Sequence, residues 1–212
     1  MADRHAQVIA SNASLGPVAA SPATVVVCAD GGLAVALAAG RAVDLVVGDL
    51  DSASADDLAR AEAAGARIQP HPTTKDESDL ELALAAAIDG GASSVTAHLA
   101  DGGRLDHQLA NLLVLASPRW AAARVDAWVG DGRVWVVRDT FELPLAPGDP
   151  VAIQPVGGPA TVSTGGLAFP LDDEVLDPTH ARGIANEVVG VPAVVRVRDG
   201  VVLVISSNSA VA

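Results

Sequence analysis

The 212-residue sequence has one cysteine, one lysine and no tyrosine, and aromatic residues make up only 2% of it. The single cysteine, Cys28, excludes an intrachain disulfide framework and is typical of the reducing cytoplasm. With so few aromatic side chains, the core has to be built from Val, Leu, Ile and Ala. This composition favours Ala-rich helices packed against Val-rich strands.

Long apolar runs and an excess of positive charge are absent as well. No run approaches the roughly 18 apolar residues that a membrane-spanning helix needs, and the N-terminal residues lack the apolar core of a signal peptide. The 26 acidic and 13 basic residues give a net charge of −13, which argues against binding to nucleic acid or to an anionic membrane. We therefore expect a soluble cytoplasmic protein that binds neither nucleic acid nor a membrane. An anionic ligand would have to be bound locally or through metal ions.

Short Val, Ile and Ala runs alternate with Ala- and Leu-rich segments of helical spacing from residue 7 to about residue 115. This alternation predicts a mostly parallel β-sheet covered by helices on both faces, a Rossmann-like α/β sandwich. The expected strands are 7–10, 24–29, 43–47, 66–69 and 93–98, and the expected helices are 33–39, 55–64, 78–88 and 106–115.

The pattern changes after Pro118. Residues 124–129 and 133–137 are strand-like and flank a glycine-rich turn, which predicts a hairpin. From Thr140 onward there are only strand-length apolar segments and no convincing helix.

A second hairpin is predicted near the C-terminus, where Arg198-Asp199-Gly200 separates the apolar segments 193–197 and 201–205. We therefore expect two domains. An α/β domain would occupy residues 1–139, and a smaller all-β domain would occupy residues 140–212.

Asp30, Gly31 and Gly32 directly follow the expected strand 24–29. The two glycines let the backbone approach a ligand closely, and they precede a helix whose first amides could accept a phosphate. An ordinary strand-to-helix turn is the alternative explanation for this motif.

Asp49 and Asp51 follow the next expected strand, 43–47. Residues i and i+2 of an extended chain point the same way, so both carboxylates can converge on one metal ion. Capping of the following helix by Asp51 or Ser52 is the alternative, but it explains only one of the two aspartates.

The only lysine, Lys75, stands in the acidic stretch PTTKDESDLE. If a helix begins near Ser78, Asp76 and Asp79 lie three residues apart on one of its faces. Acidic residues are favoured at a helix N-terminus for dipole reasons alone, but a lysine is not. A phosphate site would explain both the acidic residues and the lysine, because the carboxylates would hold a cation and the ammonium group would contact phosphate oxygens.

The stretch DGGRLDHQLAN, residues 101–111, leads into another helix. Arg104 can form two hydrogen bonds with a phosphate, Asp106 is placed to cap the helix, and His107 and Asn111 lie one turn apart. Neither GxxxxGK[ST] nor GxGxxG occurs, which excludes the usual P-loop and dinucleotide sites. The four motifs follow strands of a parallel sheet, at the edge where ligands bind. They predict a nucleotide-phosphate site of aspartates, magnesium, one lysine and one arginine.

The order ADGG, GDLDS, KDESDLELAL, GGRLDHQLAN resembles the motifs ADGG, GDFDS, KDxTDxExAL and GGRxDHxxxN of the thiamine pyrophosphokinase family. TGGLAFPL from Thr164 and GIANE from Gly183 are similar to that family's TxGLxYPL and SxSNE segments. The resemblance implies an α/β catalytic domain followed by a β-sandwich domain. It also implies a homodimer, with thiamine held between the catalytic domain of one subunit and the β-domain of the other.

The implied reaction moves the terminal pyrophosphoryl group of ATP to the hydroxyethyl oxygen of thiamine and releases AMP. Matching motif by motif assigns roles to individual residues. The residues that hold Mg²⁺ or lie beside it would be Asp49, Asp51, Asp76 and Asp79, which with Lys75 form the catalytic set. The residues that contact ATP, besides Lys75, would be Asp30, Gly31, Gly32, Arg104, Asp106, His107 and Asn111.

Thiamine would be contacted by Thr164, Phe169 and Asn186. The serine positions of the family's SxSNE segment read Gly183 and Ala185 here, so a pyrophosphokinase that acts on another heterocyclic alcohol stays open. A non-catalytic sensor that binds Mg-ATP without turnover stays open as well. A phosphatase of the haloacid dehalogenase type, suggested by the Asp-x-Asp pair, is disfavoured by the surrounding motifs.

Overall fold

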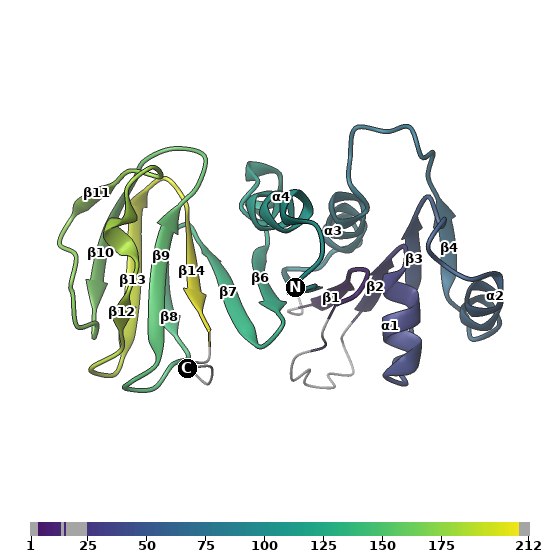
Figure 1. Ribbon diagram of the computed structural model, residues 1–212, viewed down its shortest axis with the longest axis horizontal. Coiled ribbons are helices and arrows are strands. Elements are labelled where there is room, and N and C mark those ends of the chain that lie inside the picture. Colours follow the sequence, from purple (N-terminus) through teal and green to yellow (C-terminus); the bar gives the residue numbers. More distant parts are fainter. Residues whose placement is uncertain (1–3, 14, 16–24, 208–212) are drawn as a thin grey trace. The chain divides into compact units, whose positions relative to one another are not determined.

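The computed structural model describes residues 4–13, 15 and 25–207, and the contacts within the chain divide it into two compact units, Met1–Gly130 and Asp131–Ala212 (Figure 1). The sequence analysis placed the boundary between the two domains later, between residues 139 and 140. The difference is one strand, Gly132–Val137, which pairs with a strand of the second unit.

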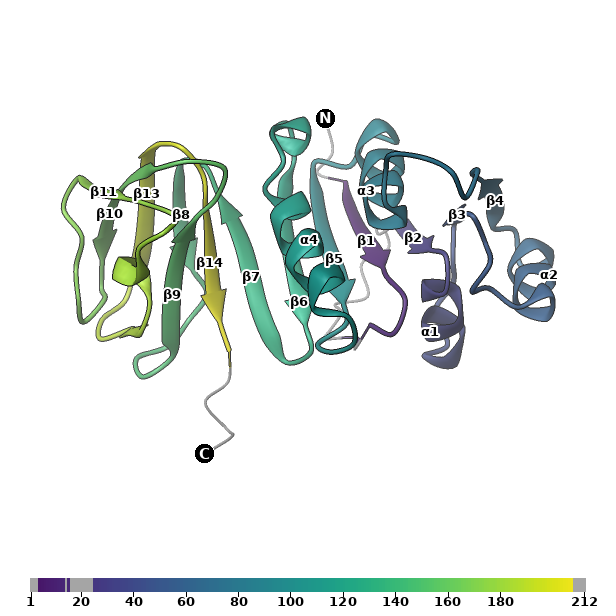
Figure 2. The ribbon, with the colours of Figure 1, turned by 45° about the horizontal axis from the view of Figure 1, so that its top comes forward.

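The first unit is built on a parallel sheet. Its strands lie in the order β6-β5-β1-β2-β3-β4, and every pairing recorded between them is parallel. Their bounds are β1 His5–Ile9, β2 Val25–Ala29, β3 Leu45–Gly48, β4 Arg67–Pro70, β5 Ser94–Leu99 and β6 Arg124–Val129. Because parallel strands end at the same edge, the turns after β1, β2, β3 and β5 lie along one edge of the sheet (Figure 2).

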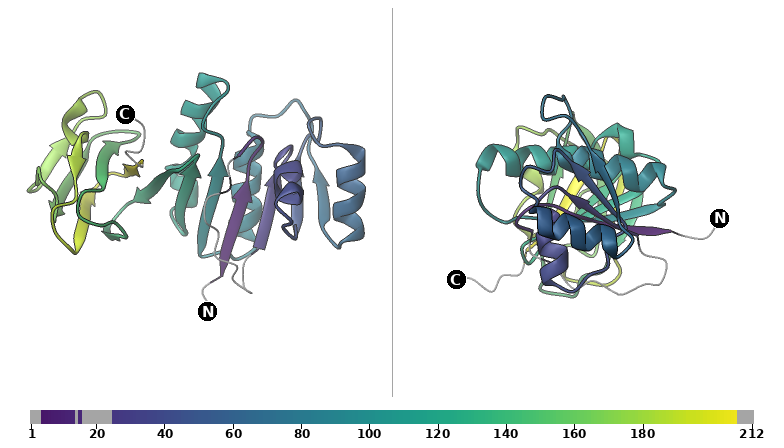
Figure 3. Two further views of the ribbon diagram at one scale, coloured as in Figure 1. Left: turned by 60° about the horizontal axis from the view of Figure 1, so that its bottom comes forward. Right: turned by 90° about the vertical axis from the view of Figure 1, so that its right-hand side faces the viewer.

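Helices cover both faces of this sheet (Figure 3). Leu33 of the first helix shares a core cluster with Ile9 and Cys28 on one face. Side chains alternate along a strand, so Val8 and Val27 point to the other face, where the third helix contacts β1, β2, β3 and β5. The helices are α1 Gly32–Ala38, α2 Ala55–Ala63, α3 Asp79–Asp89, α4 Leu105–Leu115 and the short 3₁₀ helix η1 Pro118–Trp120.

The strands and helices expected between residues 7 and 115 are all present, with bounds that differ by at most two residues. The predicted mixed α/β fold is confirmed. The segment expected to open a hairpin, β6, extends the parallel sheet by pairing with β5. None of the helices in the described residues has the length and hydropathy of a membrane-spanning segment.

The second unit consists of antiparallel strands that form two groups, β12-β9-β14-β7 and β11-β10-β13-β8. Apolar side chains from both groups form one core cluster, which includes Ile153, Val162, Val195 and Val204. The bounds are β7 Gly132–Val137, β8 Thr140–Leu143, β9 Pro150–Pro155, β10 Ala160–Gly165, β11 Glu174–Leu176, η2 Ala181–Gly183, β12 Asn186–Glu187, β13 Ala193–Asp199 and β14 Val202–Ser206.

The hairpin predicted around Arg198-Asp199-Gly200 is wrong. The turn exists, with Gly200 at φ 86°, but β13 pairs with β10 and β8 whereas β14 pairs with β7 and β9. The turn therefore carries the chain from one sheet to the other. Turn chemistry specifies a local reversal, and it does not specify which strands supply the hydrogen-bonding partners.

Gly32, the first residue of α1, lies so close to β1 that an added Cβ would overlap the Ile9 carbonyl oxygen and lie 3.1 Å from the Ala10 carbonyl carbon. Both groups belong to the backbone. We expect Gly32→Ala to lower the free energy of unfolding by about 1–3 kcal/mol, measured by urea denaturation.

Gly158→Ala is the matched control. Nothing lies within 4 Å of an added Cβ at that position, and its φ is outside the left-handed region. We expect a change below about 0.5 kcal/mol. Equal losses in the two variants would contradict the close approach of α1 to β1.

Candidate functional site

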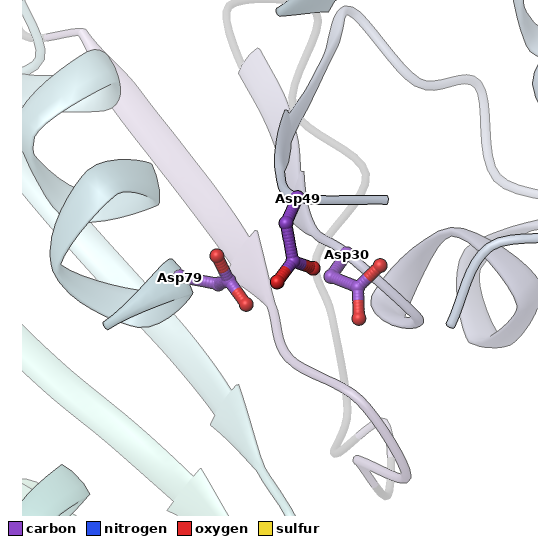
Figure 4. Close-up of side chains that lie close together, drawn as sticks. All are labelled: Asp30, Asp49 and Asp79. Carbon is purple, nitrogen blue, oxygen red and sulfur yellow. The ribbon is translucent and has the colours of Figure 1, made fainter. Parts of the chain in front are cut away.

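Three carboxylates converge at the edge of the parallel sheet where the strands end. Asp30 follows β2, Asp49 follows β3, and Asp79 is the first residue of α3. One oxygen from each lies within 4.8 Å of the others, although the residues come from three separate segments (Figure 4). This set contains two residues from the expected metal group and one, Asp30, from the expected nucleotide contacts.

The backbone at the ends of β2 and β3 makes this convergence possible. Asp30 has a left-handed conformation (φ 45°), its N–H donates to the Val47 carbonyl oxygen at 2.8 Å, and its carboxylate accepts from the Ser52 N–H at 3.2 Å. Gly48 lies between the acidic residues at φ 136°, and an added Cβ there would lie 3.1 Å from both the Asp30 Cβ and the Asp79 Oδ1. Gly48 thus leaves the space that the carboxylates need, a role that the sequence analysis missed.

The start of α3 fixes the third carboxylate. Ser78 is the N-cap, and a capping box joins it to Glu81: the Ser78 hydroxyl accepts from the Glu81 N–H, and the Glu81 carboxylate accepts from the Ser78 N–H. Asp79 is therefore held in the first turn, where its negative charge also interacts favourably with the helix dipole.

Lys75 lies directly beside this cluster. Its ammonium nitrogen is 3.1 Å from the Asp79 Oδ1 and 4.0 Å from the Asp49 Oδ2, and only 13% of its side chain is exposed. The Asp79 side chain as a whole is 30% exposed, but its Oδ1 atom is buried and has no aligned hydrogen-bond donor within the described residues. The short contact with Lys75 is thus an ion pair whose alignment falls short of a hydrogen bond.

A cavity of about 770 Å³ opens beside the cluster, a volume within the range of small-molecule sites. It brings together the third and fourth sequence motifs, because Lys75 and Asp79 line it with residues of the turn after β5 and of α4. The lining residues are Ala10, Ser11, Asn12, Ala29, Lys75, Ser78, Asp79, Leu80, Ala100, Asp101, Gly102, Gly103, Arg104, His107, Gln108 and Asn111. Ser11 and Asn12 were missed, although their place directly after β1 was a usable signal.

Arg104 and Asp106 form a two-point ion pair at the start of α4. The Arg104 Nη2 lies 2.6 Å from the Asp106 Oδ2, and the Arg104 Nε donates to Oδ1 at 3.1 Å. The prediction that Asp106 caps α4 is wrong: Arg104 is the N-cap residue, and Asp106 lies in the first turn, where it accepts from the His107 N–H. The hydrogen bond from Arg104 is the main reason that the pKa of Asp106 falls to about 2.

Asp51 and Asp76, two further members of the expected metal group, are exposed and lie outside the three-carboxylate cluster. Leu50 has a left-handed backbone (φ 63°), so Asp49 and Asp51 do not have the extended geometry on which their convergence was expected. Asp76 precedes the N-cap Ser78 and therefore does not share a helical face with Asp79.

Gly31 and Gly32 are explained by packing. An added Cβ at Gly31 would lie 2.9 Å from the Ser11 Oγ, and one at Gly32 would overlap the backbone of β1. The two glycines therefore let the start of α1 approach the turn after β1, whether or not a ligand is bound.

The residues expected to contact an acceptor lie in the second unit. Asn186 is buried and joins the Phe169 backbone twice: its Oδ1 accepts from the Phe169 N–H at 3.0 Å, and its Nδ2 donates to the Phe169 carbonyl at 2.8 Å. The Thr164 hydroxyl accepts from the Leu171 N–H at 2.9 Å. Both polar side chains thus hold the loop that presents the Phe169 ring, which is 61% exposed.

The chain matches the family model described as "Thiamin pyrophosphokinase, catalytic domain" over residues 18–127. A search of curated protein sequences found no match. Among solved structures, the thiamine pyrophosphokinase from Bacillus subtilis has a TM-score of 0.81 at 19% identity, with 97% of this chain and 100% of that chain covered.

Two other solved structures give the same result for the fold. A thiamin pyrophosphokinase family protein from Enterococcus faecalis has a TM-score of 0.76 at 24% identity, covering 96% of this chain and 98% of that chain. The thiamin pyrophosphokinase from Geobacillus thermodenitrificans has a TM-score of 0.76 at 22% identity, covering 98% and 99%. These identities are low, so the three structures establish the similarity of fold alone.

The ion pair at the start of α4 can be tested by titration. In the Arg104→Met variant we expect the pKa of Asp106 to rise from about 2 toward its ordinary value of 3.8, followed by NMR of the side-chain carboxyl carbons. A lowered folded-state pKa favours folding above the ordinary value, and this contribution is lost as the pH falls through about 2. Arg60→Met, which removes a partner of Asp57, should leave the Asp106 titration unchanged. An unchanged pKa in Arg104→Met would contradict the assigned cause.

Proposed function

The chain belongs to the thiamine pyrophosphokinase family, and we propose that the acidic edge of its first unit binds Mg-ATP for transfer of a pyrophosphoryl group to the hydroxyl of thiamine, which gives thiamine diphosphate and AMP. The observation that carries the proposal is the convergence of Asp30, Asp49 and Asp79 beside the only lysine of the chain, on a cavity that also exposes Arg104. This arrangement combines acceptors for a cation with donors for a polyphosphate.

The chemistry of the carboxylate cluster fits magnesium. Mg²⁺ takes oxygen ligands and is usually bound through one or two carboxylates together with substrate phosphates and waters. The Asp79 Oδ1, buried without an aligned donor, is an acceptor that a cation would satisfy. Asp30, Asp49 and Asp79 would hold the ion, and Asp51 and Asp76 remain candidates at the exposed margin. When bound, the metal would supply charge neutralisation on the phosphate oxygens.

Lys75 and Arg104 are the cations that line the cavity, and we assign them to the triphosphate. Arg104 presents a planar group that suits two-point contact with phosphate, and Asp106 holds its orientation. His107 and Asn111 line the same cavity from the first two turns of α4, and we assign them to the nucleotide together with Gly31 and Gly32.

The reaction asks the protein mainly for positioning and charge neutralisation, because pyrophosphoryl transfer proceeds without a covalent enzyme intermediate in this proposal. The preorganised pieces are the capped start of α3 and the left-handed turn at Asp30. Both place charged groups on rigid elements of the sheet edge, so little reorganisation is needed when the substrate binds.

For the acceptor, we propose that the exposed Phe169 ring provides an apolar wall for thiamine. Asn186 and Thr164 would act through the loop that they hold, because their polar groups already bond to its backbone. Gly183 departs from the family's serine for a packing reason: an added Cβ there would overlap the Ile153 carbonyl oxygen. The departures at Gly183 and Ala185 favour, as a second candidate, an acceptor that is a different heterocyclic alcohol.

We further propose the two-domain organisation that the resemblance implies, a Rossmann-like catalytic domain followed by a β-sandwich acceptor domain, assembled as a homodimer. An apolar stripe on α4 supports the dimer. Leu105, Leu109 and Leu113 recur at every fourth residue of α4 and are 78%, 57% and 48% exposed. Such a stripe normally packs against another surface. The cytoplasmic location and the absence of nucleic-acid and membrane partners remain predictions.

The reaction is tested by incubating the protein with ATP, Mg²⁺ and thiamine and resolving nucleotides and thiamine esters by chromatography. We expect AMP and thiamine diphosphate in equal amounts and neither without thiamine. Asp79→Asn should lower kcat/KM by about 100-fold or more, because it removes one charge from the metal cluster.

Asp89→Asn, an exposed change at the other end of α3, is the control and should leave kcat/KM within about twofold of the parent. Tight ATP binding without thiamine-dependent formation of AMP would contradict the assignment of thiamine as the acceptor. AMP formed with another heterocyclic alcohol would support the second candidate, and none with any acceptor would indicate a sensor.

The dimer is tested on α4. Leu109→Glu places a charge in the middle of the leucine stripe, and we expect it to shift the protein from dimer to monomer in sedimentation velocity experiments. Ala110→Glu introduces the same charge at the next, exposed residue outside the stripe and should leave the dimer intact. A dimer that persists in Leu109→Glu would place the interface elsewhere.

A further inference from the structure

The carboxylate cluster already contains a cation of its own. The Lys75 ammonium is 3.1 Å from the Asp79 Oδ1 and 4.0 Å from the Asp49 Oδ2. Asp30 is the third carboxylate of the cluster, and one oxygen from each of the three lies within 4.8 Å of the others. Three carboxylates at such distances repel one another strongly unless positive charge lies among them. Within the described residues, Lys75 is the cation recorded in contact with Asp49 and Asp79.

The contact is of a kind that can be exchanged. The Asp79 Oδ1 lies close to the ammonium but has no aligned hydrogen-bond donor, so the pair relies on charge and leaves the oxygen available as a ligand. A lysine ammonium is a compact charge on a flexible stem with rotatable donors, whereas an arginine would bind one carboxylate as a rigid fork. Every other Lys or Arg position in the chain is arginine.

The cavity offers the Lys75 ammonium a second position. It lines the same cavity as Arg104, the cation at the start of α4, so its ammonium can turn from the carboxylates toward an anion in that cavity. Its side chain is 13% exposed, so it is largely shielded from open solvent although it lines the cavity.

We propose that Lys75 is the counter-ion of the carboxylate cluster in the nucleotide-free protein. When ATP binds, a divalent cation replaces the Lys75 ammonium at the carboxylates, and the ammonium then pairs with the phosphates. The proposal rests on the proposed function. It means that Lys75 competes with a bare divalent cation but cooperates with a metal–nucleotide complex. Removing the ammonium should therefore change the two affinities in opposite directions.

The experiment titrates Mn²⁺ into the full-length protein without nucleotide and measures free Mn²⁺ by electron paramagnetic resonance. We expect Lys75→Met to bind Mn²⁺ at least about tenfold more tightly than the parent, because the competing charge is gone. The same variant should bind Mn²⁺ with a non-hydrolysable ATP analogue about tenfold or more weakly, because a phosphate contact is lost.

Arg104→Met is the matched control, since it removes one positive charge from the same cavity but not from the cluster. It should weaken analogue binding and change the affinity for bare Mn²⁺ by no more than about twofold. An equal gain in Mn²⁺ affinity in both variants would show that the gain comes from the change in net charge alone, and it would overturn the proposal. Unchanged or weaker Mn²⁺ binding in Lys75→Met would overturn it as well.

Thermal denaturation provides a second readout in case Lys75→Met folds poorly. In EDTA the variant should melt below the parent, and Mn²⁺ should raise its melting temperature more than it raises that of the parent. A metal-induced rise that is equal or smaller in the variant would contradict the proposal. The Mn²⁺ titration uses no thiamine and no turnover, so failure of the counter-ion role is distinguishable from failure of the proposed reaction.

Discussion

Three carboxylates within 4.8 Å of one another repel unless a cation lies among them, and the edge of the sheet in the first unit is built around this constraint. Each carboxylate is fixed by a different backbone device: a left-handed turn at Asp30, a side-chain-free residue at Gly48 next to Asp49, and a capping box before Asp79. The sheet and its helices supply the rigidity that keeps like charges together. Such strain is tolerated where function uses it.

Much of the first unit could be predicted because its signals are local. Alternating apolar segments gave its strands and helices nearly to the residue, and the four motifs were placed correctly at the ends of strands. The members of the carboxylate cluster could not be chosen from spacing alone. That choice depends on the left-handed φ of Leu50, which turns Asp51 away from the extended geometry, and on the start of α3 after Ser78. Neither is encoded in a periodic pattern.

The second unit was harder to predict for a different reason. The strands β7, β13 and β14 were predicted, but the partners of these strands are set by long-range packing, so the Asp-Gly turn before Val201 joins two sheets rather than two paired strands. The role of Asn186 was equally hidden. A polar residue in a segment that resembles the family's SxSNE motif suggests ligand contact, whereas here its amide is satisfied by the Phe169 backbone. Similarity of motif therefore points to the loop of Phe169, and the hydrogen bonds show that Asn186 holds the backbone of this loop.

The separation of β13 and β14 also bears on how the chain folds as it is synthesised. β14, residues Val202–Ser206, pairs on one side with β7 and on the other with β9, so that sheet cannot close until the ribosome has released residue 206. The strands of the first unit all precede residue 130. The first unit can thus fold early during translation, while β7 and β9 wait with exposed edges, the stage at which a nascent chain most needs a chaperone.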